Sequence, residues 1–229
     1  MAGAGKKTFT AGEVLTASDV NGYLMEQSVM VFGGTAARSS AIPTPSEGMV
    51  SYVADVDNLQ LYNGSAWQPA SGLQLVKTQT IGTGVSSVTV TGAFSAAYDA
   101  YKVIISGGVA STNNVLNMQF PSNTTAYYWS AKNVSWAGVT TDYTGNNTGS
   151  FGRVGYGTAD NIQCTFELVN PFLTKNTIFT GTYIAPIAGG DGAYTTGALL
   201  NTNSISSFTI NTGAGTLTGG TIAVYGYSK

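Results

Sequence analysis

The 229-residue sequence contains no histidine and one cysteine, Cys164. Without histidine, Ser-His-Asp and Cys-His nucleophilic catalysis are excluded, and so are most zinc sites. One cysteine cannot form a disulfide within the chain, and the alternating run around Cys164 predicts a half-buried strand residue rather than a nucleophile. We therefore expect no catalytic residue, no metal site and no cofactor.

Charge is also scarce, since only 9% of the residues are charged and the net charge is -2. No basic stripe is available to neutralise phosphates, so nucleic-acid binding is not expected. No apolar run approaches the roughly 20 residues that span a bilayer. The N-terminal segment lacks the apolar core of a signal peptide. We expect synthesis in the cytoplasm without membrane insertion.

A surface this poor in charge, and rich in Gly, Thr, Ser and Asn, is unusual for a small domain that exists alone. It predicts that copies of the chain, or a larger assembly, cover much of the surface. The alternative is a neutral and soluble β-sandwich.

The N-terminal part of the chain predicts small elements that need neighbours. Residues 1–11 are expected to form an extended arm, and residues 15–32 a helix. Thr16 can cap this helix, because Asp19 follows three residues later in a pattern close to a capping box. Val31 lies in line with the apolar residues of the first turns and is expected on the same helical face.

Residues 33–48, with Gly and Ser early and two prolines late, predict a linker. The alternating runs that follow predict a β-hairpin up to residue 69, with a turn that begins at Asp55. Asp55 and Asp57 superficially match a calcium loop. Glutamine stands where that loop needs glycine, and alanine where it needs glutamate, so we interpret the two acids as turn residues.

A second turn is predicted at Asn63-Gly64, a dipeptide typical of tight turns. This turn would direct Trp67 back onto Tyr52 or Tyr62. The aromatic residues of this segment are therefore expected to pack on one another rather than on a ligand.

From residue 70 to residue 229, short alternating runs of Val, Ile, Thr, Tyr and Phe recur between Gly, Asn and Ser clusters. About ten short strands without a convincing helix predict an antiparallel, jelly-roll-like β-sandwich. The chain is thus predicted to be mainly β, in two domains. Domain 1–69 holds the arm, a short helix and the hairpin, and domain 70–229 holds the sandwich.

Residues 124–150 concentrate aromatic and amide side chains. Sugars are bound by stacking on aromatic rings and by hydrogen bonds to Asn, Asp and Thr. Residues 138–150 are expected to form a long polar loop, and such loops often carry function. The alternative is that Tyr127, Trp129 and Trp136 point inward as ordinary strand residues. The candidate glycan-binding residues are Tyr128, Trp129, Trp136, Asp142, Tyr143, Asn146 and Asn147.

A polysaccharide-cleaving enzyme needs only two carboxylates a few Å apart. The five acids of the sandwich are scattered in sequence and mostly adjoin turn residues, so we expect no enzymatic activity. A polysaccharide depolymerase stays open as a lesser alternative. The five acids are Asp99, Asp142, Asp160, Glu167 and Asp191.

Three stretches, FTAGEVLTASDVNGYLMEQSVMVF (9–32), AARSSAIPTPSEGMVSYVAD (36–55) and LQLYNGSAWQP (59–69), resemble an N-terminal module common in tail and fibre proteins of tailed bacteriophages. NVLNMQF, FELVNPFLTKNT and the closing SISSFTINTGAGTLTGGTIAVYGY resemble a β-sandwich domain of phage fibre and other virion proteins.

The resemblance implies a virion component of the phage tail, usually a homotrimer, that is assembled in the host cytoplasm. Residues 1–69 would attach to other tail or virion proteins, and the sandwich would face the host and bind a bacterial surface polysaccharide. The family shares no catalytic residues that could be carried over. The alternative role is purely structural, as a capsid decoration protein or a tail or baseplate component.

Overall fold

The computed structural model describes residues 8, 10–25, 28–70 and 72–228. The chain divides into two compact units, the first ending at Gly72 and the second covering Leu73–Tyr227. Most of the predicted arm, residues 1–7 and 9, lies outside the described residues. The prediction of a mainly β chain with a short helix, a hairpin and an antiparallel sandwich is confirmed.

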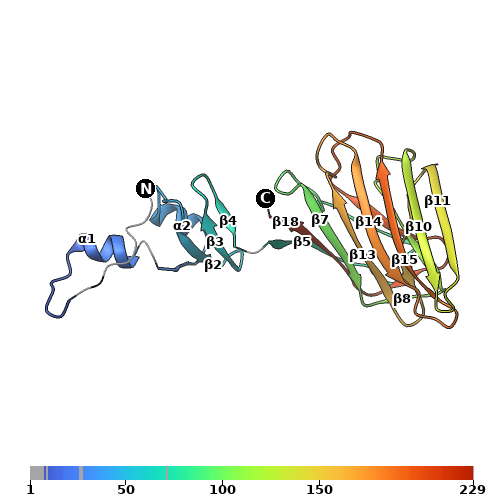
Figure 1. The fold of residues 1–229 in the computed structure, drawn as a ribbon, viewed down its shortest axis with the longest axis horizontal. Helices are drawn as coiled ribbons and strands as arrows, with labels where there is room; N and C mark the ends of the chain where they lie inside the picture. Colours follow the sequence, from blue (N-terminus) through green and yellow to red (C-terminus); the bar gives the residue numbers. More distant parts are fainter. Residues whose placement is uncertain (1–7, 9, 26–27, 71, 229) are drawn as a thin grey trace. The chain divides into compact units, whose positions relative to one another are not determined.

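The first unit is a small sheet with short helices (Figure 1). Its strands pair in the order β1-β2-β3-β4. β1 and β2 run parallel because the chain returns through α2 between them, whereas the other pairs are antiparallel. The elements are α1 (Ala17–Asp19), the π-helix η1 (Val20–Met25), β1 (Met30–Phe32), α2 (Thr35–Ala41), β2 (Val50–Val53), β3 (Asn58–Tyr62) and β4 (Trp67–Pro69).

The N-terminal helix begins as predicted, but residues 30–32 do not continue it. The Asp19 backbone N–H donates to Thr16 Oγ1 at 3.1 Å, and the Thr16 N–H donates to Asp19 Oδ2 at 3.1 Å, which completes a capping box. Val31, expected on the helical face, lies in β1 and is exposed. β1 stays extended because it pairs with β2, a partner about 20 residues away that local spacing cannot reveal.

The segment predicted as a linker, residues 33–48, contains α2, so that prediction is wrong. The N-cap residue Gly34 has no side chain to cap the helix. The cap comes instead from Asp55 in the β2–β3 turn, whose Oδ2 accepts from the Thr35 N–H at 2.8 Å and from Thr35 Oγ1 at 3.1 Å. The helix was missed because its capping group lies 20 residues from Thr35 in the sequence.

The predicted hairpin is confirmed as β2 and β3, and Asp57 lies in its turn with φ of 47°. At the second predicted turn, Asn63 Oδ1 accepts from the Ala66 N–H at 2.8 Å. Trp67 then packs on Tyr62 rather than on Tyr52, with ring centroids 5.4 Å apart.

Contacts of the Arg38 side chain hold α2 against this sheet. Its side chain is 6% exposed, donates to Gln60 on β3, and places its guanidinium 4.4 Å from the Trp67 ring centroid. Such cation–π contacts contribute roughly 0.5–2 kcal/mol. The Asp55 cap and the buried Arg38 thus both join α2 to the strands of the first unit.

The second unit is a sandwich of two antiparallel layers. The larger layer runs β5-β18-β7-β13-β14-β15-β10-β11, and the smaller layer runs β12-β9-β16-β6. β13 pairs with β12 through Ile162–Cys164 and with β7 through Cys164–Val169, so the two layers join there. β8 and β17 form a separate pair.

The strands of this unit are β5 (Leu73–Thr80), β6 (Ser87–Val90), β7 (Ala100–Ser106), β8 (Val109–Ala110), β9 (Asn114–Gln119), β10 (Tyr127–Ser135), β11 (Thr140–Thr148), β12 (Phe151–Gly157), β13 (Ile162–Val169), β14 (Thr177–Ile184), β15 (Asp191–Leu199), β16 (Phe208–Thr212), β17 (Leu217–Thr218) and β18 (Thr221–Tyr227). Figure 1 shows β7, β13, β14, β15, β10 and β11 side by side across one face.

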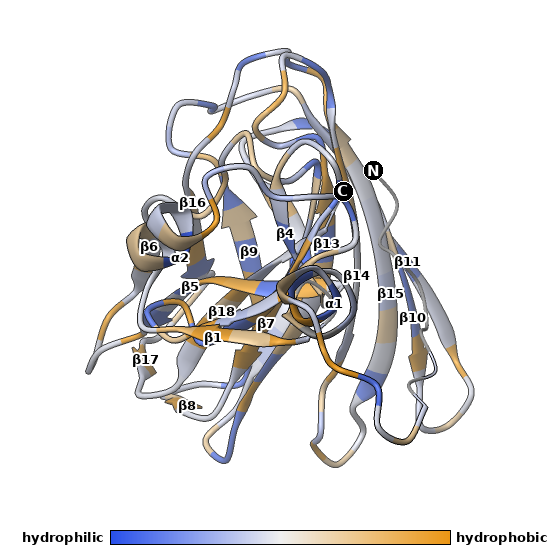
Figure 2. Ribbon diagram, turned by 90° about the vertical axis from the view of Figure 1, so that its left-hand side faces the viewer, coloured by the Kyte–Doolittle hydropathy of each residue, from blue (hydrophilic) through white to orange (hydrophobic). Residues whose placement is uncertain are grey.

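Buried aromatic rings bridge the two layers. Phe151 on β12 stacks on Phe179 of β14 at 4.9 Å between centroids, and Phe166 on β13 meets Phe208 of β16 edge-on at 6.1 Å. All four side chains are almost fully buried, and each contributes roughly 1.5–3 kcal/mol through burial. In Figure 2, hydrophobic and hydrophilic segments alternate along β9, while β15 is pale because it consists mostly of Gly, Ala, Thr and Tyr.

The segment predicted as a long polar loop, residues 138–150, is mostly the strand β11, so that prediction is wrong. Among the described strands, β11 pairs with β10 alone and lies at the edge of the sheet, and most of its side chains are exposed. An edge strand that is polar on both faces lacks the apolar alternation by which strands are recognised. None of the helices in the described residues has the length and apolarity needed to cross a bilayer.

The cap that Asp55 provides should be measurable. We expect Asp55→Ala to accelerate amide hydrogen exchange over Thr35–Ala41 about fivefold, because loss of a helix cap costs roughly 1 kcal/mol. The control is Glu47→Ala, which removes an acid of the same unit that does not cap α2. Equal exchange rates in the two variants would contradict the assigned cap.

Candidate ligand-binding site

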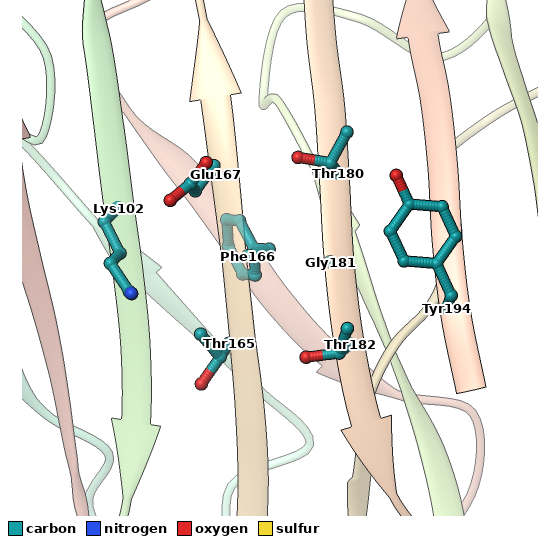
Figure 3. Close-up of a pocket in the computed structure, with 8 residues that line it drawn as sticks. All are labelled: Lys102, Thr165, Phe166, Glu167, Thr180, Gly181, Thr182 and Tyr194. Carbon is teal, nitrogen blue, oxygen red and sulfur yellow. The ribbon is translucent and has the colours of Figure 1, made fainter. Parts of the chain in front are cut away.

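A shallow groove with a volume of about 250 Å³ lies on the outer face of the larger layer (Figure 3). Its walls come from four adjacent strands, β7, β13, β14 and β15. The lining residues are Lys102, Thr165, Phe166, Glu167, Thr180, Gly181, Thr182 and Tyr194.

Strand register assembles the groove from residues far apart in sequence. Lys102 lies opposite Glu167, and Glu167 lies opposite Thr180, which makes one row of side chains across three strands. Figure 3 shows this row in order from β7 to β14. Residues directly opposite each other on antiparallel strands point to the same face and lie about 5 Å apart. The three polar side chains can therefore contact the same bound ligand.

A second row runs beside the first, with Thr165 opposite Thr182 and Thr182 opposite Tyr194. Between the rows, Gly181 contributes only backbone to the floor. A Cβ at that position would lie 2.9 Å from the Cβ of Phe166, which packs beneath it. The groove thus has a flat backbone floor between two polar walls.

The groove combines hydrogen-bonding side chains with an aromatic ring. Threonine hydroxyls both donate and accept hydrogen bonds, Lys102 donates, and Glu167 accepts. The Tyr194 side chain is 53% exposed and supplies an aromatic ring beside the hydroxyls. Hydroxyl groups and a ring edge or face are the features that recognise a polyhydroxylated ligand with apolar faces.

The carboxylate of Glu167 is held in place by a neighbour on β18. The Tyr227 hydroxyl donates to Glu167 Oε1, and this hydrogen bond, with smaller effects of burial and of the carboxylate charge, raises the pKa of Tyr227 to about 12. The bond restrains Glu167 before any ligand arrives, which lowers the entropy that binding must overcome.

Two of the predicted residues lie on this outer face. Tyr128 is 37% exposed on β10. Asp142 on β11 forms an ion pair with Lys132 at 3.2 Å, and Lys132 lies opposite both Asp142 and the groove residue Tyr194. Both side chains of the ion pair are largely exposed, so the pair contributes little to stability.

Trp129 and Tyr143 face the interior instead. The Trp129 indole lies against Gly145 and Gly152 and donates from Nε1 to Thr148 Oγ1 at 3.1 Å. The Tyr143 ring lies under the Arg153 guanidinium, whose Cζ is 3.3 Å from the ring centroid. Both rings are thus engaged within the sandwich.

The other predicted residues lie at opposite ends of the β10–β11 hairpin. Trp136, 56% exposed beyond the end of β10, donates from Nε1 to the Ile187 carbonyl at 3.1 Å. Asn147 accepts at Oδ1 from the Ala126 N–H at 2.9 Å, beside the exposed Asn146. The eight residue steps along β10 separate the two ends by roughly 26 Å, at about 3.3 Å per residue. The predicted residues are therefore not brought together into one site.

A polar network inside the sandwich connects two opposite charges through neutral groups. Arg153 Nη1 donates to Tyr183 Oη at 2.8 Å, and Asn133 Nδ2 donates both to the same oxygen at 2.8 Å and to Asp191 Oδ2 at 2.7 Å. Asn133 is 2% exposed. Because these residues come from β12, β14, β10 and β15, the network ties the layers together.

Cys164 is completely buried in β13, deeper than the half-buried position predicted for it, and burial raises the pKa of its thiol. Its reactivity is low for that reason. Across residues 8, 10–25, 28–70 and 72–228, no three His, Cys, Asp or Glu side chains gather as a possible metal site.

The sequence interpretation missed Lys102, Thr165, Thr180, Thr182 and Tyr194, and named Glu167 only as an acid. Alternation along each strand does place these residues on the polar face. The sequence does not reveal that β7, β13, β14 and β15 pair with one another, nor in which register.

Comparison of the chain with protein-family models, with curated proteins and with solved structures gave no match.

The packing of Trp129 predicts a strong effect of one methyl group. A Cβ added at Gly145 would lie 2.0 Å from Trp129 Nε1, so Gly145→Ala should destabilise the sandwich by roughly 1–3 kcal/mol. Urea unfolding monitored by tryptophan fluorescence measures the change.

Gly192→Ala on β15 is the matched control, because an added Cβ there meets none of the described heavy atoms within 4 Å. Equal stability of the two variants would show that Trp129 can leave its position at no cost.

The hydrogen bond between Tyr227 and Glu167 predicts a pH dependence. The pKa of Tyr227 is raised to about 12, above the ordinary value of about 10. The bond therefore contributes its full stability below pH of about 10, and this contribution is lost as the pH rises through about 12.

Glu167→Gln should lower the pKa of Tyr227 towards its ordinary value, since the charged acceptor is replaced by a neutral one. A titration of the tyrosine Cζ resonances by ¹³C NMR, assigned with Tyr227→Phe, measures the change. An unchanged Tyr227 titration in Glu167→Gln would contradict the bond.

Proposed function

We propose that the protein is a component of a tailed-bacteriophage particle and attaches it, without catalysis, to a polysaccharide of the bacterial surface. The chemistry of the groove is the observation that supports this proposal. Its threonine hydroxyls, Lys102 and Glu167 can hydrogen-bond sugar hydroxyls, and the exposed ring of Tyr194 offers an apolar surface for a sugar ring.

The chemistry of the groove supports binding rather than cleavage. Hydrolysis of a glycosidic bond requires two carboxyl groups that flank it. Glu167 is the one carboxylate among the described residues that line the groove, and one of its oxygens accepts from Tyr227.

The first unit supports attachment to a larger assembly. Several large apolar side chains there are exposed, and exposed apolar surface of this kind is typical of interaction sites. This agrees with the resemblance of residues 9–69 to the attachment module of phage fibres. Assembly as a homotrimer would present three grooves at once and raise avidity without new contacts. The exposed side chains are Val14, Leu15, Met25, Val29, Val31, Val56, Leu59 and Leu61.

A second candidate is a structural role in the particle, as a capsid decoration protein or a tail or baseplate component. The observation that favours it is the group of exposed apolar residues on the outer face of the larger layer, outside the groove. Val169, Ile178 and Ile184 are 41%, 42% and 49% exposed and could pack against a neighbouring protein.

Removal of the aromatic ring from the groove tests the proposed function. We expect Tyr194→Ala to weaken binding of the full-length protein to a host polysaccharide at least about tenfold, or 1.4 kcal/mol. Ile184→Ala, an exposed position on the same face outside the groove lining, should bind like the unaltered protein. Biolayer interferometry against a panel of neutral and acidic bacterial surface polysaccharides measures the affinity.

Three outcomes would argue against the proposal. Absence of binding to every polysaccharide in the panel, with normal adsorption of particles that carry Tyr194→Ala, would refute it. Failure of those particles to assemble would favour the structural role. Release of reducing sugar ends by the purified protein would favour a depolymerase.

A further inference from the structure

The second row of the groove does not end at Tyr194. Tyr194 lies opposite Lys132 on β10, and Lys132 lies opposite Asp142 on β11. The outward row Thr165, Thr182, Tyr194, Lys132, Asp142 is therefore continuous from β13 to the edge of the sheet.

The first row extends in the same way. Thr180 lies opposite Thr196, Thr196 opposite Ser130, and Ser130 opposite Thr144. Starting from Lys102 on β7, this row crosses six strands to β11. Five strand spacings of about 4.8 Å give a length of roughly 24 Å.

Apolar side chains border the two polar rows on both sides. Tyr128 and Ile178 belong to the next outward row on one side, and Val134 and Ile184 to the next on the other. Each border lies two residues, or roughly 7 Å, from the nearest polar row. The four side chains are between 37% and 49% exposed. The polar rows thus form one continuous band, narrow along the strands and long across them.

The band is electrically balanced. Lys102 and Lys132 offset Glu167 and Asp142, and Lys132 and Asp142 are paired at 3.2 Å. The remaining members of the two rows, apart from Tyr194, are threonines and one serine, whose hydroxyls donate and accept. A charged polymer would gain no net attraction from such a band, whereas a neutral chain of hydroxyl groups would find partners along its whole length.

From this geometry we propose that the groove is the centre of an extended track that binds a linear, uncharged polysaccharide lying across the strands, from β7 to β11. The inference rests on the proposed function and adds the class of ligand: a neutral chain bound along its length, not a terminal sugar. Ser130, Lys132, Asp142 and Thr144 form the end of the track beyond the groove.

Dependence on chain length tests the track. Fragments of the neutral polysaccharide that binds in the panel, prepared by partial hydrolysis and sized from the disaccharide upward, are titrated into the full-length protein by calorimetry. Affinity should rise with fragment length and level off once the fragment spans the track.

The double variant Ser130→Ala/Thr144→Val removes two hydroxyls at the far end of the track. It should weaken binding of the long fragments about three- to tenfold, the effect of one or two hydrogen bonds, and leave the shortest fragments unaffected. Thr141→Val is the matched control, because Thr141 lies on the same strand but opposite Asn133, whose side chain is buried inside the sandwich. This control should bind all fragments like the unaltered protein.

The outcomes separate the track from the proposed function. Equal affinity for all fragment lengths, or equal loss for short and long fragments in the double variant, overturns the track and leaves glycan binding intact. Preference for acidic polysaccharides overturns the assignment of an uncharged ligand. Absence of all binding overturns the proposed function itself. If a second copy of the chain covers this face, sedimentation will show self-association that the double variant weakens, and the track is wrong.

Discussion

The register between β13 and β14 is the constraint on which both the core and the groove depend. Phe166 lies opposite Gly181, and with this pairing Phe166 and Phe179 point into the sandwich while Glu167 and Thr180 point out. A shift of one residue would reverse every side chain of the strand. The aromatic contacts between the layers therefore select the register, and the polar rows of the outer face follow from it.

In this sandwich, glycines leave room for aromatic side chains of neighbouring strands. Trp129 occupies space that Gly145 and Gly152 leave open, and its indole nitrogen is satisfied by Thr148. The same principle applies on the inner face at Gly181, where the missing Cβ leaves room for Phe166 and Phe179.

The first unit depends on contacts between segments that are individually weak. α2 has no side chain of its own at the N-cap and begins where Asp55 reaches it from the β2–β3 turn. Arg38 then connects the helix to β3 and β4, through a hydrogen bond to Gln60 and a cation–π contact with Trp67. Such small elements bury little surface, so a few specific polar contacts hold them, and several large apolar side chains stay exposed.

The sequence by itself determined the class of the fold, the capping box at Thr16 and the hairpin, because these depend on alternation and on neighbours a few residues apart. It left Tyr52 and Tyr62 open as the partner of Trp67, and the structure selects Tyr62. It also determined that no histidine side chain is available, since the sequence contains none. Only the tertiary structure decided that Thr140–Thr148 form an edge strand, and that Tyr194 lies beside Thr182 in a groove. The physical reason is that alternation specifies which side chains share a face of one strand, whereas pairing across strands is set by the packed core.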